Sequence, residues 1–374
     1  MRVSCQRKNL SPRALRDMWT TGGPGWSGVL RESIRTVSKK KSSGGCPIEP
    51  GIAPLTLPSG RMLALVNVPG YSDSLKNTIR GLSVDLARLI VAADDGVMPQ
   101  TLDHLEVLNF LKAGSGMVVL SKADLVDEET LELAELEIRE VLAGTFPEDR
   151  PVIPFSAVDR RGAEEVRAAI EAVAPDVSGK TDDTPFRLRI DKVRSFPRFD
   201  TVASGTILAG STSEDGPVQL LPSGKETKAR FIQVHYERVD RAASGQRVGI
   251  NLHKISIDDV SVGVALAAPG SLRSGYIPNV GISVLPKARK AVVNRQRVRL
   301  YAGTCGMNAL VVLMERQRLN PGESGLVRFR LHEPLIVLPK DPFVICPIYA
   351  AHSVIAVRGE DEFDQDGFHQ AVDQ

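Results

Sequence analysis

Four short apolar runs follow one another in the first half of the chain. They span Leu63–Val68, Leu86–Ala93, Gly116–Leu120 and Val152–Phe155. Each run is apolar almost throughout rather than alternating, and polar or turn-forming residues follow it. Runs of this length and pattern are typical of strands that are buried on both faces of a parallel sheet.

Between these runs, apolar residues return at helical spacing. Leu102–Lys112 places leucines three residues apart and precedes Gly114, which predicts the end of a helix there. Asp127 is a good N-cap for a second helix that runs to about Leu142 and stops at Gly144.

A third short amphipathic helix is expected over Ala163–Val173. Strands that alternate with helices in this way indicate an open α/β sheet.

The pattern changes near residue 175. A polar, linker-like segment covers 176–184, and after it short strands alternate with Gly, Pro and Ser turns without a helical period. One group of strands falls in 186–255, and a second follows the turn at Ser274-Gly275. Such spacing predicts two antiparallel β-barrels after the α/β domain.

These patterns divide the chain into five parts. Residues 1–45 show no clear period and are left unassigned, with helix plausible only around Pro12–Trp19. The α/β domain is expected over 46–176, the first barrel over 184–270 and the second over 275–359. The tail at 360–374 is acidic and expected to be disordered.

Composition narrows the class of protein. At 374 residues the chain is too long for one core, and its apolar fraction of 42% is ordinary for a globular protein. The net charge of +2 gives no whole-molecule attraction to nucleic acid, so any RNA contact would come from a local patch. No apolar run is long enough to cross a bilayer, and the basic N-terminus lacks the apolar core of a secretory signal.

The four cysteines match no zinc or CxxC spacing; they are Cys5, Cys46, Cys305 and Cys346. They are therefore expected to be reduced thiols, and a cytoplasmic location away from membranes is expected.

The residues with the most distinctive chemistry follow the predicted strands, where ligands bind in open α/β sheets. Val68-Pro69-Gly70 follows one run, Ser121–Leu125 (SKADL) another, and Ser156-Ala157 the last. The segment Gly96–His104 (GVMPQTLDH) lies between them. Each motif alone is weak, since a Lys-Ala-Asp after a strand is usually a helix cap; their order and spacing carry the argument.

Taken together, these motifs resemble the elongation factor Tu-like translational GTPases. Gly96–His104 matches the Gly-x-x-x-Gln-Thr-x-x-His segment of that family residue for residue, and Ser121–Leu125 is similar to its guanine-recognition motif, Asn/Thr-Lys-x-Asp. The resemblance implies a P-loop GTPase-type domain followed by two Tu-like barrels, with GTP and Mg²⁺ as ligands.

The resemblance implies a guanine site at Lys122, Asp124, Ser156 and Ala157, with Gly70 on the phosphate side. A carboxylate such as Asp124 accepts two hydrogen bonds from the N1–H and N2–H₂ of guanine, donors that adenine does not offer as a pair. Lys122 can lie across the ring, and the backbone N–H of Ala157 can meet O6. The other interpretation is a helix cap beside an ordinary turn.

The barrels carry a more specific resemblance. The segments Leu220–Leu252, Asn294–Thr304 and Leu319–Ile345 are similar to the second and third domains of the selenocysteine-specific elongation factors. A selenocysteine pocket should offer cationic or hydrogen-donating groups, and His235 and Arg247 lie in the first of these segments. The alternative is that both are surface residues on exposed strand faces.

Four departures affect the half of the site that would hold phosphate, magnesium and water. No GxxxxGK[ST] phosphate loop occurs anywhere in the chain. Pro47 stands where the family has a magnesium-sensing hydroxyl, Asn67 replaces its magnesium-supporting Asp, and Tyr71 replaces the His that positions water. Phosphoryl transfer needs all these parts together, so we expect weak or absent GTP binding and no competent hydrolysis. We therefore expect no catalytic residue and no metal ligand at these positions.

The resemblance implies GTP-dependent delivery of selenocysteyl-tRNA to the ribosome. Two alternatives stay open: a non-hydrolysing module that binds tRNA or the ribosome, and a decayed, truncated paralogue in which 1–45 arises from a shifted frame. The chain ends soon after the second barrel, so the winged-helix domains of bacterial relatives, which bind a messenger RNA hairpin, are not expected.

Overall fold

The computed structural model describes two compact units of the chain. The described residues are 5–7, 18–21, 51–68, 86–110, 115–145, 148–173, 184–196, 199–234, 237–286, 288, 290–339, 341–348 and 356–358. The first unit is built almost entirely from residues before 183, and the second almost entirely from residues after it. Each unit is described by itself.

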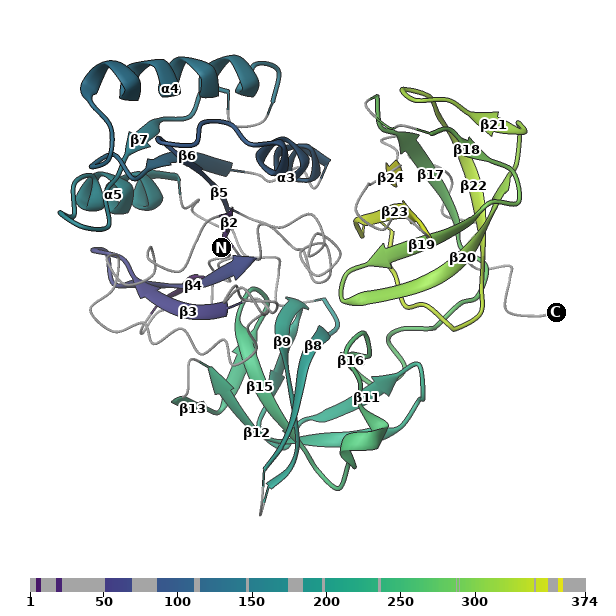
Figure 1. Cartoon of the computed structure of the whole chain (residues 1–374). Coiled ribbons are helices and arrows are strands. Elements are labelled where there is room, and N and C mark those ends of the chain that lie inside the picture. The colour runs from purple at the N-terminus through teal and green to yellow at the C-terminus, as the bar shows by residue number, and fades with distance from the viewer. Residues whose placement is uncertain are drawn as a thin grey trace. The chain divides into compact units, whose positions relative to one another are not determined.

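A seven-stranded sheet forms the centre of the first unit (Figure 1). Its path runs β1-β4-β2-β5-β6-β7, with β3 paired to the other side of β4. The strands are β1 (Cys5–Arg7), β2 (Met18–Thr21), β3 (Gly51–Thr56), β4 (Arg61–Val68), β5 (Leu86–Ala92), β6 (Ser115–Ser121) and β7 (Val152–Pro154). The four apolar runs are therefore strands, as predicted.

The sheet is mixed rather than wholly parallel. β2, β4, β5, β6 and β7 run in one direction, whereas β1 and β3 pair with β4 in the opposite direction. β3 and β4 form a hairpin, which needs only a short turn between antiparallel strands.

The N-terminal segment contributes two strands, β1 and β2, that its sequence does not predict. Met18 and Trp19 lie in β2, between β4 and β5, so the helix considered for Pro12–Trp19 is wrong at its C-terminal end. The remainder of that stretch lies outside the described residues. Only four residues long, β2 is too short to show a period; its pairing with two longer strands places it.

Among the described residues, three helices pack against the two faces of this sheet. α3 (Pro99–Phe110) and α4 (Glu128–Leu142) pack on one face, where Leu105 and Ile138 meet strand residues of β5 and β6. α5 (Ala163–Val173) packs on the other through Val166 and Ile170. All three helices were predicted, although α3 begins at Pro99 and leaves Leu102 40% exposed.

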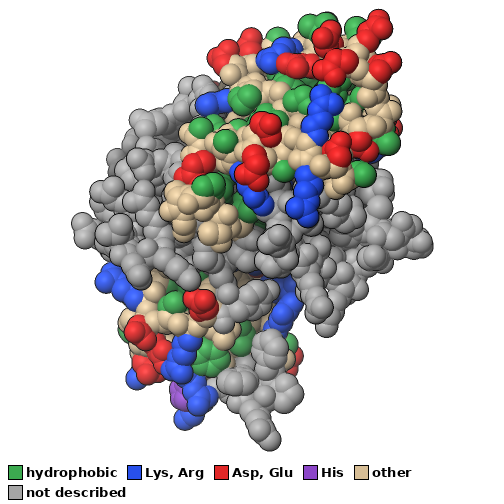
Figure 2. Space-filling model, turned by 90° about the vertical axis from the view of Figure 1, so that its left-hand side faces the viewer, with side chains coloured by type: hydrophobic (Ala, Val, Ile, Leu, Met, Phe, Trp, Pro, Cys, Tyr) green, Lys and Arg blue, Asp and Glu red, His purple; other side chains and the backbone are tan. Residues whose placement is uncertain are grey.

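The N-terminus of α4 forms as its sequence predicts. The carboxylate of Asp127 accepts a hydrogen bond from the backbone N–H of Thr130 at 2.9 Å. This bond satisfies one of the backbone donors that a helix leaves free at its start. It also holds the pKa of Asp127 below its ordinary value. Gly144, just past the helix, has a φ of +72°. Acidic side chains alternate with apolar ones over the part of the surface that α4 forms (Figure 2).

The second unit begins with a ring of antiparallel strands. Its sheet order is β11-β16-β8-β9-β15-β12-β13, and a further pairing of β11 with β12 joins the run to itself. The ring consists of β8 (Arg187–Phe196), β9 (Phe199–Ala209), β11 (Pro217–Leu221), β12 (Glu226–Val234), β15 (Arg247–Leu252) and β16 (Ala265–Ala267), with β13 (Glu237–Val239) at the edge. β10 (Ser211–Ser213) and β14 (Arg241–Ala243) form a small separate sheet.

A closed barrel follows in the same unit. It consists of β17 (Asn279–Val284), β19 (Arg297–Ala302), β20 (Cys305–Leu313), β22 (Ser324–Leu331), β23 (Phe343–Pro347) and β24 (Ala356–Arg358). β18 (Val292–Val293) and β21 (Arg318–Leu319) pair beside it. The antiparallel β architecture predicted for this half is confirmed, and a single 3₁₀ turn, η2 (Ile257–Asp259), is its one helical element among the described residues.

Apolar side chains of alternating strand residues fill each of the two β structures. Leu188, Ile190 and Ile250 belong to the core of the first, and Val298, Leu300 and Phe329 to the core of the second. The described helices include none that is long and apolar enough to cross a bilayer.

Candidate functional site

The parallel strands β5, β6 and β7 end at one edge of the sheet. Their C-terminal residues are Ala92, Ser121 and Pro154, and the loops that follow begin with Ala93, Lys122 and Phe155. This edge is where ligands bind in open α/β sheets. The sequence placed Lys122, Asp124, Ser156 and Ala157 on these loops, and the structure brings the loops together.

Backbone hydrogen bonds tie the loops after β5, β6 and β7 to one another. Ala93 N–H donates to the carbonyl of Ser121 at 2.8 Å, and Ala123 N–H donates to the carbonyl of Phe155 at 3.1 Å. The hydroxyl of Ser121 also donates to the carbonyl of Val91 at 3.1 Å. The loop that carries Lys122 and Asp124 is therefore fixed beside the loop that carries Ser156 and Ala157.

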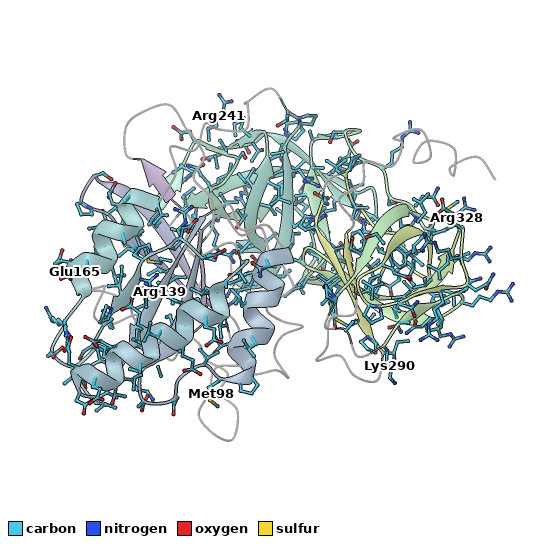
Figure 3. The ribbon with its side chains drawn as sticks, turned by 90° about the horizontal axis from the view of Figure 1, so that it is seen from above. Met98, Arg139, Glu165, Arg241, Lys290 and Arg328 are labelled. Carbon is cyan, nitrogen blue, oxygen red and sulfur yellow. The ribbon has the colours of Figure 1, made fainter. Side chains whose placement is uncertain are left out.

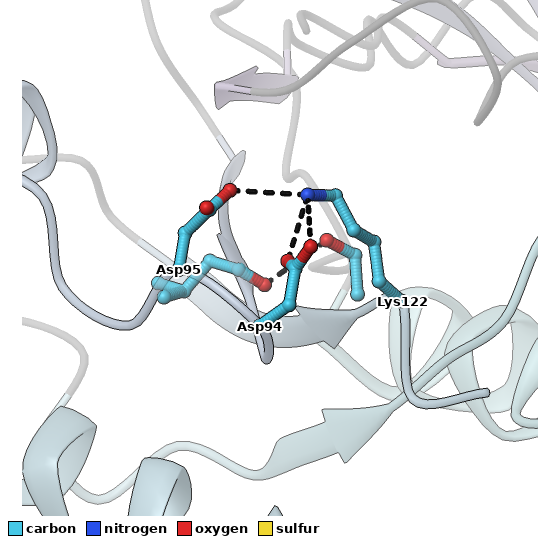
Figure 4. A network of polar contacts seen from close by, with 5 residues as sticks. Asp94, Asp95 and Lys122 are labelled. Carbon is cyan, nitrogen blue, oxygen red and sulfur yellow. Dashed lines mark hydrogen bonds and ion pairs between the residues drawn. The ribbon is translucent and has the colours of Figure 1, made fainter. Parts of the chain in front are cut away.

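Two carboxylates hold the ammonium group of Lys122. Its Nζ lies 2.7 Å from both carboxylate oxygens of Asp94 and 3.0 Å from one of Asp95 (Figure 4). Hydrogen bonds to Asp94 and then Asp95 raise the pKa of Lys122, so the side chain stays charged throughout the physiological range. The sequence motif named Lys122 but missed its two partners, although two acids directly after a neighbouring parallel strand were a usable signal.

Asp124 and Ala157 each have a polar group without a partner among the described residues. Asp124 is exposed, and its carboxylate makes no hydrogen bond to any described residue. The N–H of Ala157 likewise donates to no described group. Guanine has hydrogen-bond donors along one edge and an acceptor, O6, beside them. An exposed carboxylate can accept from the donors, and an N–H on the adjoining loop can donate to the acceptor.

Ser156 is fully buried and shapes its loop from inside. Its hydroxyl accepts hydrogen bonds from the N–H groups of Val158 at 3.1 Å and Asp159 at 3.3 Å. Its own N–H donates to the carbonyl of Arg161 at 3.0 Å. These bonds fold the chain into a tight turn, so Ser156 acts on the conformation of Ala157 rather than presenting its own side chain.

The other predicted site residues do not belong to the described nucleotide loops. Gly70, Tyr71, Pro47 and His235 lie outside the described residues, and of Asn67 only the backbone is placed, near the end of β4. Arg247 is half-buried at the start of β15.

A second candidate surface lies on the closed barrel. Residues 275–359 contain twelve Lys and Arg against four Asp and Glu, a formal net charge of +8, although the whole chain carries only +2. Seven of these arginines define what we call the arginine face, and Figure 3 shows cationic side chains projecting from this barrel. They are Arg295, Arg297, Arg299, Arg316, Arg318, Arg328 and Arg330.

Strand pairing sets two of these arginines in one row across β20. Leu310 on β20 faces Arg297 of β19 on one side and Arg330 of β22 on the other. Arg299 donates to the side-chain oxygen of Asn308 at 3.1 Å, and Arg328 donates to that of Asn279 at 2.9 Å. These partners are neutral, so the charges stay uncompensated.

None of the seven arginines forms an ion pair with a carboxylate of the described residues. This surface is not among the sites predicted from the sequence. Its signal is arginine at every second position in NRQRVRL, ERQRL and VRFRL, because alternate residues of a strand share one face.

The chain is similar to a known protein family and to curated proteins. Residues 32–176 match the elongation factor Tu GTP binding domain. Over 292 residues, 78% of this chain, the sequence is 32% identical to the selenocysteine-specific elongation factor of Desulfomicrobium baculatum. The chain spans 46% of that relative's length.

Solved structures show the same fold. A bacterial selenocysteine-specific elongation factor superposes with a TM-score of 0.80 at 23% identity, over 91% of this chain and 57% of the other. The translation elongation factor SelB from Methanococcus maripaludis in its apo form gives a TM-score of 0.75 at 20% identity, over 94% of this chain and 79% of the other.

Proposed function

Because the chain is a homologue of the selenocysteine-specific elongation factors over most of its length, we propose that it is a translation elongation factor whose substrate is selenocysteyl-tRNA. Delivery of that tRNA to the ribosome in the cytoplasm follows from the same proposal. The arginine face carries it, because RNA is a polyanion and proteins gain affinity for it by neutralising phosphates.

The arginine face suits the sugar-phosphate backbone of a folded RNA. Neighbouring strands lie about 4.8 Å apart, so Arg297 and Arg330, two strands apart, present charges roughly 10 Å from each other. Guanidinium groups bind phosphate through two hydrogen bonds at once. A row of such groups on a rigid barrel recognises phosphates without reading base sequence.

Filter binding with charged and uncharged tRNA at several salt concentrations tests the proposal. The double variant Arg297→Ala/Arg330→Ala should weaken binding and reduce the slope of log affinity against log salt by about one for each arginine removed. The matched control is Arg139→Ala, which removes an arginine that pairs with Glu135 on α4 and should change neither quantity. Equal affinity of the double variant and the control would contradict an RNA-binding barrel.

Specificity for the aminoacyl group is assigned to Arg247 and His235. A selenol ionises below neutral pH, so a cationic side chain favours selenocysteine over serine. The variant Arg247→Ala should lose the preference for selenocysteyl-tRNA over seryl-tRNA while keeping its affinity for uncharged tRNA. If neither binding preference changes, these residues are ordinary surface groups.

We further propose that the guanine side of the nucleotide site is kept while GTP and Mg²⁺ bind weakly. Asp124 and Ala157 supply the guanine contacts, and Lys122 lies beside them. A charged hydrogen bond contributes about 1.5–3 kcal/mol, which is less than the ~4 kcal/mol of millimolar binding. Calorimetry with GDP and GTP, with and without Mg²⁺, should give no dissociation constant below the micromolar range.

Pro47, Asn67 and Tyr71 favour a second candidate, a module that binds tRNA or the ribosome without hydrolysing GTP. The two candidates differ in one measurement. A working factor releases phosphate from GTP faster when ribosomes are added. The module binds tRNA with an affinity that does not depend on nucleotide.

A further inference from the structure

A cluster of buried charges lies in the second unit and shares no residue with the nucleotide loops or the arginine face. Arg187 and Arg189 on β8 both reach the carboxylate of Asp341. Arg187 donates through two nitrogens at 2.7 and 2.9 Å, and Arg189 donates through one at 2.7 Å. All three side chains are 10–11% exposed.

The cluster is not neutral. Two guanidinium groups, which stay protonated in proteins, face one carboxylate, so one positive charge is left over. Burial lowers the pKa of Arg189, and so does the positive charge of Arg187. The charge of Asp341 raises that pKa, but the net effect is a decrease. An uncompensated buried cation is costly, because the protein interior solvates charge poorly.

Unused hydrogen-bond donors lie on Arg187 itself and on residues next to this cluster. The Nε of Arg187 and the hydroxyl of Thr206 are buried without a partner, and Thr206 is the cross-strand neighbour of Arg189. The hydroxyl of Thr304 is also buried and unpaired. Buried polar groups in proteins almost always have partners, so three orphans at one place indicate a ligand or ordered water.

The backbone is shaped to let the Arg189 guanidinium pass. Gly303, next to Thr304, has a φ of +57°, and a Cβ there would lie 1.6 Å from Nη1 of Arg189. Only glycine fits this turn of the closed barrel. The geometry therefore brings the turn that carries Thr304 against Arg189.

We propose that this cluster, between β8 and the turn at Gly303, is a binding site for a small monovalent anion such as chloride. The ligand is anionic because the leftover charge is positive and the Nε of Arg187 can only donate. It is monovalent because the excess is one charge. It is small because the surrounding side chains are about nine-tenths buried. The proposal is independent of any tRNA or nucleotide activity.

Cys305 is a competing source of negative charge beside Arg189. Its thiol is half-buried, follows Thr304, and lies near enough to Arg189 for the two charges to interact. If the thiolate neutralised the cluster, no anion would be needed. The experiment therefore includes the variant Cys305→Ser.

Line broadening of ³⁵Cl in solution measures chloride binding directly, with the full-length protein at neutral pH. We expect broadening by the wild type that bromide or nitrate reverses. Arg189→Met, which removes the excess charge, should abolish the broadening, and Arg189→Lys, which keeps it, should retain it. Arg139→Met removes an exposed, paired arginine and serves as the matched control, with broadening like the wild type.

Thermal unfolding gives a second readout. Replacing gluconate by chloride at constant ionic strength should raise the Tm of the wild type and of Arg189→Lys by about 2–4 °C at saturating chloride, and that of Arg189→Met by none. Absence of broadening in the wild type overturns the proposal. Broadening that appears only in Cys305→Ser overturns it as well, and assigns the counter-charge to the thiolate.

Discussion

A single residue conformation brings three charges together at the candidate nucleotide site. Lys122 has a φ of +58°, a left-handed conformation that costs about 1–2 kcal/mol for a residue with a Cβ. The turn directs its ammonium group to Asp94 and Asp95, whose contacts offset part of that cost. Because the side chain is 42% exposed, solvent screens these contacts and leaves them modest.

Gly162 supports the same site through its lack of a side chain. Its φ is +77°, and a Cβ there would lie 2.0 Å from the carbonyl oxygen of Pro154. The turn that positions Ser156 and Ala157 closes just before this glycine.

We expect Gly162→Ala to destabilise the first unit by more than the ~1–2 kcal/mol of an unfavourable φ, because the new methyl group also collides with the backbone. Gly144→Ala is the matched control, since Gly144 has a φ of +72° and nothing within 4 Å of a Cβ. Urea unfolding of both variants measures the difference. Equal losses would show that the contact with Pro154 relaxes.

At the scale of an element, α4 has one buried face and one exposed face, so equal side chains on the two faces contribute differently to stability. Ile138 is 1% exposed and packs among Leu89, Val118 and Leu120, whereas Leu136 is 63% exposed. Both positions carry an aliphatic side chain of the same size, so sequence composition alone does not rank them.

Ile138→Ala should therefore lower the free energy of unfolding by about 2–5 kcal/mol, the range for a buried aliphatic side chain. Leu136→Ala in the same helix should change it by no more than about 0.5 kcal/mol. Chemical denaturation followed by circular dichroism compares them. A similar loss for both would mean that Leu136 packs against a surface in solution.

The strands of the closed barrel show how one alternation serves two purposes. In β19, Val298 and Leu300 enter the core while Arg297 and Arg299 face outward. β22 repeats the arrangement with Val327 and Phe329 inside and Arg328 and Arg330 outside. The period of two that folds the barrel also gathers its charge on one surface.

At the scale of the whole molecule, long-range pairs fix what the local sequence leaves open. Asp341 joins residues that are 154 and 152 positions earlier in the chain, Arg187 and Arg189. It also accepts a hydrogen bond from the N–H of Leu338 at 2.9 Å, which fixes the approach to β23. This carboxylate thus connects the first ring of strands with the segment that closes the barrel.

Asp341→Asn should destabilise the second unit by about 3–5 kcal/mol, because it leaves two buried arginines without a carboxylate. Differential scanning calorimetry of the full chain measures the loss. Arg139→Ala breaks an exposed pair and provides the comparison, with a much smaller effect. A loss no larger than that of the control would mean that water already solvates the cluster.

The same carboxylate predicts a dependence on pH. Burial alone would raise the pKa of Asp341, but the hydrogen bond from Arg187 and the charges of Arg189 and Arg187 outweigh it and hold the pKa below its ordinary value. The contribution to stability is complete above the ordinary pKa near 4 and is lost as pH falls through the lower folded value. The difference in unfolding free energy between wild type and Asp341→Asn should be constant from about pH 7 to pH 5 and shrink below pH 4. If the difference in unfolding free energy grew as the pH fell, the pKa of Asp341 would be raised rather than lowered by folding.

The sequence by itself determined β4 to β7, the three described helices and the family. Uniform apolar runs mark β4, β5, β6 and β7, and cap and stop residues mark α4. The guanine motif and the barrel segments led to the elongation factor resemblance. Each of these signals is local, since it depends on neighbouring residues and on the period of a helix or strand.

Only the tertiary structure decided which distant groups meet. β2 is too short to show a period, and its place between β4 and β5 depends on pairing with strands far along the chain. Lys122 with Asp94, the paired rows of arginine on the barrel, and Arg187 and Arg189 with Asp341 likewise depend on how strands align. The physical reason is that strand pairing and charge burial are long-range, so their partners have no fixed spacing in sequence.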